Sequence, residues 1–292
     1  MSAPIVCFGE TLWDVLPTGR QPGGAPFNVA VHLHQFGQPV QLISRVGQDE
    51  LGTELVDFLR AKGVDTSLVQ RSPTHLTGVV KANVDNSHEV TYKIVEPVAW
   101  DYVQYGPELK ETVANAAMLV YGSLAARRAD TRETLYQLLP SARYRVFDVN
   151  LRPPHYTRAV VETLLRQADM AKLNEHELAE ITDWLGMPAD GDAALPWLAE
   201  HYGLQAVCVT KGADGASLWV ANQLFTHPSF PIEVQDTIGS GDAFLAALLT
   251  GWQAKLAPAE CLRRACAAGA LVATHQGATP ELTAADIDAM LT

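Results

Sequence analysis

Short apolar runs alternate with amphipathic stretches through most of this sequence. Several of the runs are apolar on both faces, which is typical of the buried strands of a parallel sheet. The strand-like runs are Ile5–Gly9, Val40–Val46, Met118–Gly122, Tyr144–Val149, Asp169–Leu173 and Ala206–Thr210. One amphipathic stretch runs from Leu51 to Leu59 and stops at Gly63, and Asp130 and Glu133 have the spacing of a capping box for another helix. The alternation predicts an α/β protein with a doubly wound sheet and helices on both faces.

Two places break this alternation. The β-rich runs Thr77–Val84 and Glu89–Val95 flank the turn residues Asp85-Asn86-Ser87, which predicts a hairpin. No helical stretch lies beside it, so we expect it to form a small sheet that covers one end of the main domain. A second hairpin is expected from Ala216–Val220 and Gln223–Thr226. We find no linker and no internal repeat.

The composition excludes several classes of function. The chain has 292 residues, of which 48% are hydrophobic and 18% charged, as in a globular protein with a large core. Acidic side chains outnumber basic ones by 33 to 21, and a net charge of −12 lacks the basic surface that nucleic-acid binding requires. The longest apolar stretches are too short to cross a bilayer, and the N-terminus lacks the basic region of a secretion signal. We therefore expect a cytoplasmic protein that binds neither nucleic acid nor membranes.

The cysteines support the same compartment. Cys7, Cys208, Cys261 and Cys266 contain no C-x-x-C pair and lie in apolar segments. This predicts buried free thiols rather than disulfides or zinc ligands. Because the chain is so acidic, a phosphate ligand has to be held by backbone amides, helix ends or a metal.

The segment with the most chemical information is Asp236-Thr237-Ile238-Gly239-Ser240-Gly241-Asp242-Ala243-Phe244, just before an apolar helix. Its glycines leave the first backbone N–H groups of the helix unblocked, which makes an anion site that needs no lysine. Asp242 falls in the first turn, where its carboxylate can act as a base toward a group held at that site. In the alternative interpretation, Asp242 only complements the helix dipole and the glycines make a tight turn.

A second polar cluster lies near the N-terminus. Asp14 and Asn28 offer hydrogen-bond partners for hydroxyl groups, and Gly23 and Gly24 allow a close backbone approach. The alternative is a plain glycine turn with Asn28 in solvent. Asp14 lies just past a predicted strand, and ligands of open α/β sheets gather at the carboxyl ends of strands.

Two more clusters follow strands. Asn174 and Glu177 have the spacing of a capping box, and the same side chains can face a nucleotide phosphate and a hydrated Mg²⁺. The motif does not separate these interpretations. Arg152, just after Asp148-Val149-Asn150, is one of few cations near these segments. It can steady a phosphate or sugar oxygen, or it is an ordinary surface arginine.

Together these segments resemble the ribokinase-like (PfkB) carbohydrate kinases. The run Asp236–Asp242 is similar to the family's C-terminal signature. The run Pro22–Ala30, followed by Gly47–Gly52, is similar to its glycine-rich N-terminal region. Asn174-x-x-Glu177 and Thr210-Lys211-Gly212 match two further elements in the expected order. The resemblance covers the chain from Ile5 to about Leu282.

The resemblance implies a three-layer α/β/α Rossmann-like domain over residues 1–292 with a small β-sheet lid. The lid is expected mainly from residues of about 72–100 and from a short segment near 10–17. The resemblance also implies phosphorylation of a sugar hydroxyl by ATP with Mg²⁺, and a homodimer formed through the lid.

The choice of sugar follows from the form of the N-terminal motif. Its Gly-Gly-Ala-Pro-Phe-Asn sequence, with Trp13-Asp14 and Trp100-Asp101, is most similar to the fructokinase branch. We therefore expect fructose to be converted to fructose 6-phosphate. Ribose, 2-keto-3-deoxygluconate, tagatose and nucleosides are alternative acceptors, and a catalytically silent sugar sensor is the alternative from another class.

The resemblance also implies a role for each candidate residue. Asp242 is the expected base, and the backbone amides of Gly239, Ser240 and Gly241 are expected to hold the γ-phosphate. The residues expected to bind the sugar are Asp14, Gly23, Gly24, Asn28 and Arg152. Those expected to bind the nucleotide are Asn174, Thr210, Gly212, Gly215 and Cys266. Glu177 is expected to face Mg²⁺ through water, and Asp236 is the candidate ligand of a monovalent cation, with dependence on K⁺ left open.

Overall fold

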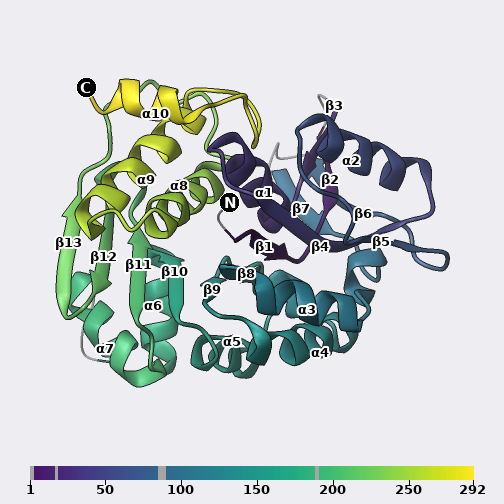
Figure 1. The fold of residues 1–292 in the computed structure, drawn as a ribbon, viewed down its shortest axis with the longest axis horizontal. Coiled ribbons are helices and arrows are strands. Elements are labelled where there is room, and N and C mark those ends of the chain that lie inside the picture. Colours follow the sequence, from purple (N-terminus) through teal and green to yellow (C-terminus); the bar gives the residue numbers. More distant parts are fainter. Residues whose placement is uncertain (1–2, 17–18, 85–89, 188–190) are drawn as a thin grey trace.

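The computed structural model describes residues 3–16, 19–84, 90–187 and 191–292, and their elements form a large sheet and a small one (Figure 1). The large sheet has nine strands in the order β13-β12-β11-β10-β9-β8-β1-β4-β5. In chain order they are β1 (Ile5–Phe8), β4 (Val40–Gly47), β5 (Val69–Ser72), β8 (Met118–Gly122), β9 (Arg145–Asp148), β10 (Met170–Asn174), β11 (Ala206–Thr210), β12 (Ala216–Val220) and β13 (Gln223–His227). The strands from β5 to β11 pair in parallel, and β12 and β13 add an antiparallel edge.

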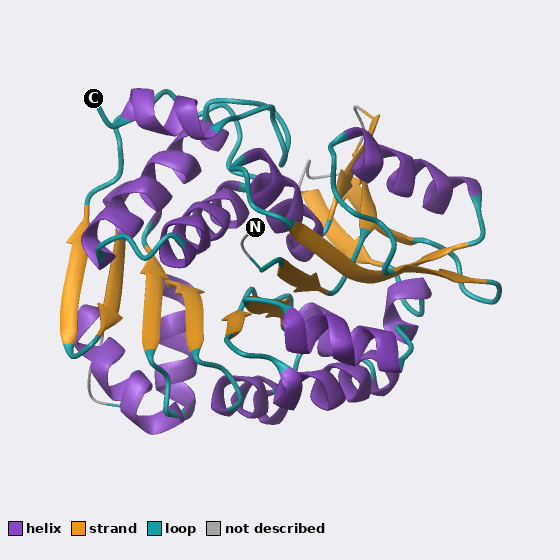
Figure 2. Ribbon diagram, in the orientation of Figure 1, coloured by secondary structure: helices purple, strands orange, loops and turns teal. Residues whose placement is uncertain are grey.

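Helices cover both faces of the large sheet, so the domain has three layers (Figure 2). Successive residues of β1 point to opposite faces, and each face has its own core: Ile5 and Cys7 belong to one cluster, Val6 and Phe8 to the other. The first core packs under α1 (Ala25–Gln35), α2 (Glu50–Ala61), α8 (Ser240–Gln253), α9 (Pro258–Ala273) and α10 (Ala284–Met290). The second packs under α3 (Pro107–Asn115), α4 (Ala129–Leu138), α5 (Arg158–Arg166), α6 (Glu175–Trp184) and α7 (Ala194–Tyr202). This confirms the predicted three-layer α/β/α class.

The small sheet has the order β3-β2-β6-β7, with β2 (Leu12–Leu16), β3 (Gly19–Gly23), β6 (Gly78–Val84) and β7 (Val90–Ile94). The strands β2 and β6 pair in parallel and the other pairs are antiparallel. The indole Nε1 of Trp13 donates to Leu51 O of α2 at 3.0 Å and ties this sheet to the main domain. Figure 1 shows the sheet beside α2, away from β13.

Most predicted strands agree with the structure to within a residue or two. Two strands were not predicted, because Val69–Ser72 is short and polar and Gly19–Gly23 contains glycine and proline, which are rare in strands. The prediction of a capping box at Asp130 is wrong. The helix α4 begins at Ala129, so Asp130 already lies inside it and cannot cap it. The predicted turn Asp85-Asn86-Ser87 lies outside the described residues.

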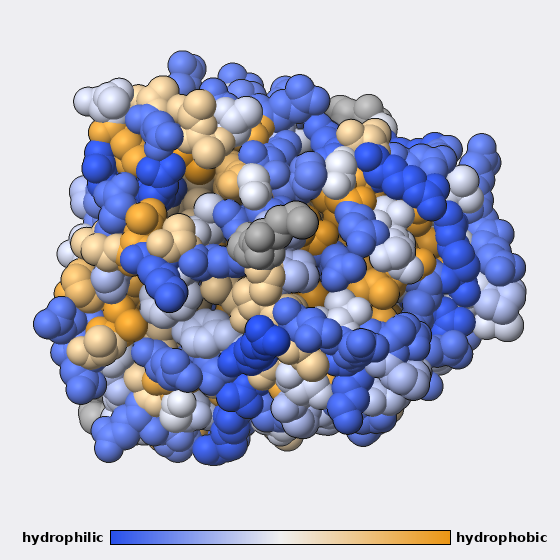
Figure 3. Space-filling view, in the orientation of Figure 1, coloured by the Kyte–Doolittle hydropathy of each residue, from blue (hydrophilic) through white to orange (hydrophobic). Residues whose placement is uncertain are grey.

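The four cysteines are buried and unpaired, as predicted. No helix in the described part of the chain is long and apolar enough to cross a membrane. Polar and charged residues cover most of the face in Figure 3, and apolar residues show in the gaps between them.

Candidate active site

A cavity of about 450 Å³ lies at the carboxyl ends of β1, β9, β10 and β11, with one face of the small sheet opposite. Leu12, Val80 and Ile94 of the small sheet contribute to its wall. Ten of the residues predicted from the sequence line it: Asp14, Gly24, Asn28, Arg152, Asn174, Glu177, Thr210, Gly239, Gly241 and Asp242. The fold therefore brings together segments that lie more than 200 residues apart in the sequence.

The N-terminus of α8 forms one wall of this cavity. Its N-cap residue is Gly239, whose φ of +79° is a left-handed conformation, and a Cβ there would lie 2.4 Å from Ala278 O. Only glycine fits this position without strain. Ser240 N donates to Thr237 O at 3.3 Å, and Asp242 N and Ala243 N donate to Gly239 O at 3.0 and 2.9 Å. Gly239 and Gly241 line the cavity, so their amides are the ones placed to form the expected anion site.

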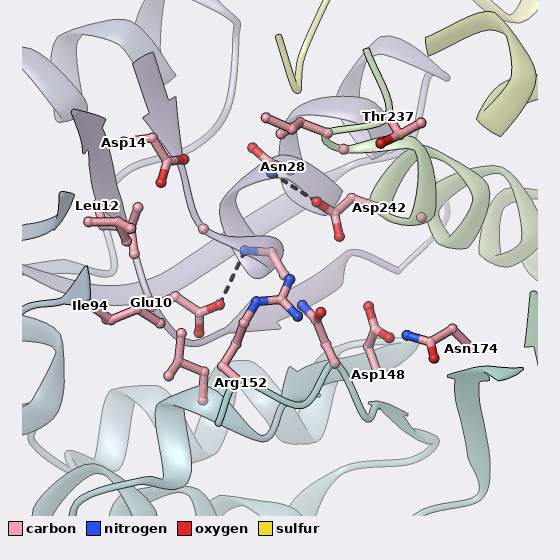
Figure 4. A pocket seen from close by; sticks show the side chains of 18 of the residues that line it. Glu10, Leu12, Asp14, Asn28, Ile94, Asp148, Arg152, Asn174, Thr237 and Asp242 are labelled. Atoms are coloured by element: carbon pink, nitrogen blue, oxygen red, sulfur yellow. Dashed lines mark hydrogen bonds between the residues drawn. The ribbon is translucent and has the colours of Figure 1, made fainter. Parts of the chain in front are cut away.

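Asp242 projects from this helix terminus toward α1. Its Oδ2 accepts a hydrogen bond from Asn28 Nδ2 at 2.8 Å, and Figure 4 shows the two side chains pointing toward each other. Burial and, next, the charge of Asp148 raise the pKa of Asp242 to about 7, against the lowering effects of Asn28, Lys172 and Arg152. A carboxylate with a pKa near neutrality is suited to accept a proton at physiological pH.

Two carboxylates lie at the opposite end of the cavity, next to the small sheet. Burial raises the pKa of Asp14 to about 6. Glu10 is 3% exposed and its Oε1 accepts from Ala25 N at 3.2 Å, while its Oε2 has no partner among the described residues. A Cβ at Gly24 would lie 2.5 Å from Glu10 O, and one at Gly23 would lie 2.4 Å from Asp14 Oδ2. The glycine pair therefore allows the start of α1 to approach these carboxylates.

A buried ion pair at the floor of the cavity was not predicted. Lys172 Nζ contacts Asp148 Oδ1 at 2.9 Å, and both residues are more than nine-tenths buried. The Oδ2 of Asp148 has no hydrogen-bond partner within the described part of the chain. The signal in the sequence was the lysine itself, since a charge inside the apolar strand Met170–Asn174 needs a buried partner.

Asn174 and Glu177 form the predicted capping box of α6. Asn174 Oδ1 accepts from Glu177 N, and Glu177 Oε2 accepts from Asn174 N, both at 2.9 Å. The second carboxylate oxygen of Glu177 accepts from Leu151 N at 2.8 Å. Both residues also line the cavity, so the capping role does not remove them from the site.

Six of the predicted residues do not line the cavity: Gly23, Gly212, Gly215, Asp236, Ser240 and Cys266. Gly215 has a φ of +89° and shapes the turn between β11 and β12. Cys266 lies on α9 and is buried in the core. Asp236 accepts from Ile238 N at 3.0 Å and from Gly277 N at 3.1 Å, which joins the approach to α8 to the C-terminal loop. Their proposed roles with nucleotide or cation stay predictions.

The C-terminal loop behind Gly239 is held by α1. His32 is fully buried, and its Nε2 donates to Ala278 O at 2.9 Å. Gln35 Nε2 donates to Pro280 O at 2.9 Å. The helix that presents Asn28 to Asp242 thus also fixes the loop that packs against Gly239, a link that sequence reasoning did not find.

These features define a class of protein. Asp242, a carboxylate with a raised pKa, lies at the N-terminus of a helix, and side chains able to form hydrogen bonds with hydroxyl groups line the same cavity. Such a site suits an α/β enzyme that transfers an anionic group to a hydroxyl. The sequence matches the pfkB family of carbohydrate kinases over residues 5–285. The chain therefore belongs to this family and is a carbohydrate kinase, as the resemblance predicted.

Individual relatives are similar over nearly the whole chain. A fructokinase of Klebsiella pneumoniae is 31% identical over 305 residues, which cover 97% of this chain and 97% of that protein. A fructokinase of Salmonella typhimurium is 32% identical with the same coverage. The crystal structure of a fructokinase with bound ATP from Xylella fastidiosa has a TM-score of 0.87 and 26% identity, and covers 100% of this chain and 98% of that one.

Proposed function

We propose that this carbohydrate kinase transfers the γ-phosphoryl group of ATP to fructose and forms fructose 6-phosphate and ADP. The observation that carries the proposal is the position of Asp242, between the first-turn amides of α8 and the hydroxyl-binding side chains on α1 and the small sheet. The fructokinase relatives, one of them with ATP bound, support the choice of substrates.

In this mechanism Asp242 accepts the proton of the attacking fructose hydroxyl. The hydroxyl oxygen forms a bond to the γ-phosphorus, and the bond from that phosphorus to the bridging oxygen of ADP breaks. The amides of Gly239, Ser240 and Gly241 stabilise the negative charge on the phosphoryl oxygens during transfer. The proton leaves Asp242 for solvent when the products dissociate.

The other lining residues bind the two substrates. Asp14, Asn28 and the glycine pair Gly23-Gly24 are assigned to the sugar hydroxyls. Burial raises the pKa of three carboxyls, Glu10, Asp14 and Asp242, and Arg152 lies close enough for its charge to oppose that rise in each. It is assigned to an oxygen of the sugar or of the transferred phosphate, and Asn174, Thr210, Gly212, Gly215 and Cys266 are assigned to the nucleotide.

The site also fits Mg²⁺. This cation prefers oxygen ligands and is usually held by one or two carboxylates together with substrate phosphates. The unpartnered Oδ2 of Asp148 and the carboxylate of Glu177, the latter through water, are the groups we assign to it. When bound, Mg²⁺ neutralises charge on the β- and γ-phosphates.

A monovalent cation also fits Asp236. Each of its carboxylate oxygens accepts one backbone N–H and keeps a second lone pair. We propose no step that depends on K⁺, and turnover measured in K⁺ and in choline tests the dependence directly.

We further propose that the small sheet acts as a lid over the sugar and forms a homodimer. Among the described residues, its outer strands β3 and β7 each pair on one side only, and such open edges tend to pair with another chain. Light scattering should give twice the chain mass of 31.6 kDa, and a monomer at micromolar concentration would contradict this. The four free buried thiols are consistent with a cytoplasmic protein.

The test of the proposal is ADP release from Mg·ATP with fructose. Replacing Asp242 by Asn should lower turnover by about 10²–10⁴-fold while ATP binding is retained. The matched control is Asp183→Asn, which changes an exposed aspartate on α6 and should leave turnover unchanged. If the Asp242 variant keeps normal turnover, Asp242 is not the base. If the wild-type protein binds sugar and ATP but releases no ADP, the protein is a silent sensor.

A further inference from the structure

A second cavity, of about 320 Å³, shares no lining residue with the cavity that contains Asp242. It lies at the base of the small sheet, where that sheet joins the main domain. Thr74 and His75 come from the connection between β5 and β6, and Tyr102 comes from the connection that leaves β7. The remaining walls are Arg45 of β4 and the first turns of α4.

Arg45 is a buried charge without a counter-charge. It is 7% exposed, and Nη1 donates to the backbone carbonyl of Tyr102. Its Nε is buried and has no hydrogen-bond partner, and no carboxylate of the described residues lies within ion-pair distance. Buried charges in proteins are normally paired, because an unpaired one is costly to desolvate. The cavity next to Arg45 is therefore the place where an anion would complete the pair.

The surroundings of Arg45 favour an anion as well. The ring of His75 stacks on Tyr102 with centroids 3.8 Å apart, and the guanidinium of Arg128 lies 5.4 Å from the centre of the same Tyr102 ring. The Nε of Arg128 is also buried and has no hydrogen-bond partner in the described part of the chain. The next residue begins α4, whose N-terminus has no side-chain cap and carries Asp130 in its first turn. The two guanidinium groups, of Arg45 and Arg128, therefore favour an anion next to Tyr102.

One carboxylate, Asp130, also lines the cavity and is exposed at its rim. It would repel an anion placed beside it, but it accepts hydrogen bonds from hydroxyl groups. Thr74 and Gln104 add neutral polar groups to the same cavity. The cavity therefore offers the cationic Arg45 to an anionic group of a ligand and Asp130 to a hydroxyl group.

We propose that this cavity is a second ligand site for a small hydroxylated anion, with a phosphate or carboxylate group paired to Arg45. The guanidinium offers Nη2, which makes no hydrogen bond to the described residues, to an oxygen of either group, and its positive charge pairs with the anion. The stacked rings of His75 and Tyr102 form a wall against the body of the ligand. Because the two cavities share no lining residue, this ligand is distinct from the substrates proposed to bind at Asp242.

Calorimetric titration tests the proposal on the full chain. The protein is first saturated with fructose and a non-hydrolysable ATP analogue, so that the cavity containing Asp242 is filled. Glycerol 3-phosphate, glycerate and uncharged glycerol are then titrated separately. We expect one equivalent of glycerol 3-phosphate or of glycerate to bind, which identifies the anionic group, and glycerol not to bind. The proposal would be overturned if neither anion binds at concentrations up to about 10 mM, which corresponds to the weakest affinity useful for such a site.

Two variants locate the binding. Arg45→Met removes the charge and should weaken binding at least about tenfold, as expected for loss of a charge-assisted pair. The matched control Lys110→Met changes an exposed lysine of α3 and should not alter binding. Gln104→Trp fills the cavity from its exposed rim and should abolish binding while turnover stays normal, which keeps the test valid if the Arg45 variant does not fold. Unchanged affinity in the folded variants would refute the site.

Discussion

Replacing Asp242 by Asn should stabilise the folded protein while it removes activity. The wild-type carboxylate has a pKa of about 7 in the folded state, raised from 3.8, so folding disfavours its charged form. The destabilisation is absent at low pH, where Asp242 is neutral in both states. It grows as pH rises from about 4 and is complete above pH 7. Asparagine is neutral throughout and its Oδ1 can still accept from Asn28.

The size of the effect follows from linkage between protonation and folding. A pKa difference of this size corresponds to about 4 kcal/mol at pH 8 and less than half of that at pH 5. Asp242 faces a cavity, and water there screens part of the charge. We therefore expect a gain of about 2 kcal/mol in the free energy of unfolding at pH 8.

Urea unfolding of wild type and Asp242→Asn at pH 8 and pH 5 measures this gain. The variant should unfold at higher urea at pH 8, and the difference should shrink at pH 5. A variant that is no more stable than wild type at pH 8, or a gain that does not depend on pH, would refute the assignment of a raised pKa to Asp242.

Three other substitutions test the site. Asn28→Ala removes the hydrogen bond that favours the charged form of Asp242, so the pKa of Asp242 should rise further. The acidic limb of the pH profile of kcat/KM should then move above its wild-type position near pH 7, and a limb that stays or moves down would contradict this role of Asn28. Gly239→Ala should lower stability by about 1–3 kcal/mol and impair turnover, because φ is positive and a Cβ would lie 2.4 Å from Ala278 O. Gly241→Ala is the stability control for Gly239→Ala, because a Cβ at Gly241 meets nothing closer than Lys172 Nζ at 3.6 Å. Equal thermal unfolding of the two variants would be inconsistent with this geometry. Glu177→Gln places an amide N–H₂ against a backbone N–H and should lower the free energy of unfolding by about 1–3 kcal/mol, even when EDTA removes any bound metal. Unchanged urea unfolding would mean that the carboxylate acts only through the metal.

The sequence predicts those parts of the fold and site that depend on local pattern. Buried parallel strands are visible as apolar runs, so Met118–Gly122 and Ala206–Thr210 were predicted with their observed bounds. The N-terminus of α8 is visible because glycines before an apolar helix have a local meaning, and the same holds for the capping box of Asn174 and Glu177.

What the sequence did not show depends on distant contacts. The bond between Asn28 and Asp242 joins residues 214 positions apart, and neither side chain alone specifies the raised pKa that results. Lys172 and Asp148 form their ion pair only because β9 and β10 are neighbours in the sheet. The short strand β3 follows from its pairing with β2, since its own residues have little preference for strands.

The most direct test of the central claim is the acceptor specificity of the purified protein. ADP release from Mg·ATP is measured with fructose, ribose, glucose, tagatose, 2-keto-3-deoxygluconate and adenosine in parallel. The account predicts turnover on fructose well above that on every other acceptor. Higher turnover on another acceptor would contradict the assignment of Asp14 and Asn28 to fructose, and no turnover on any of them would contradict catalysis by Asp242 itself.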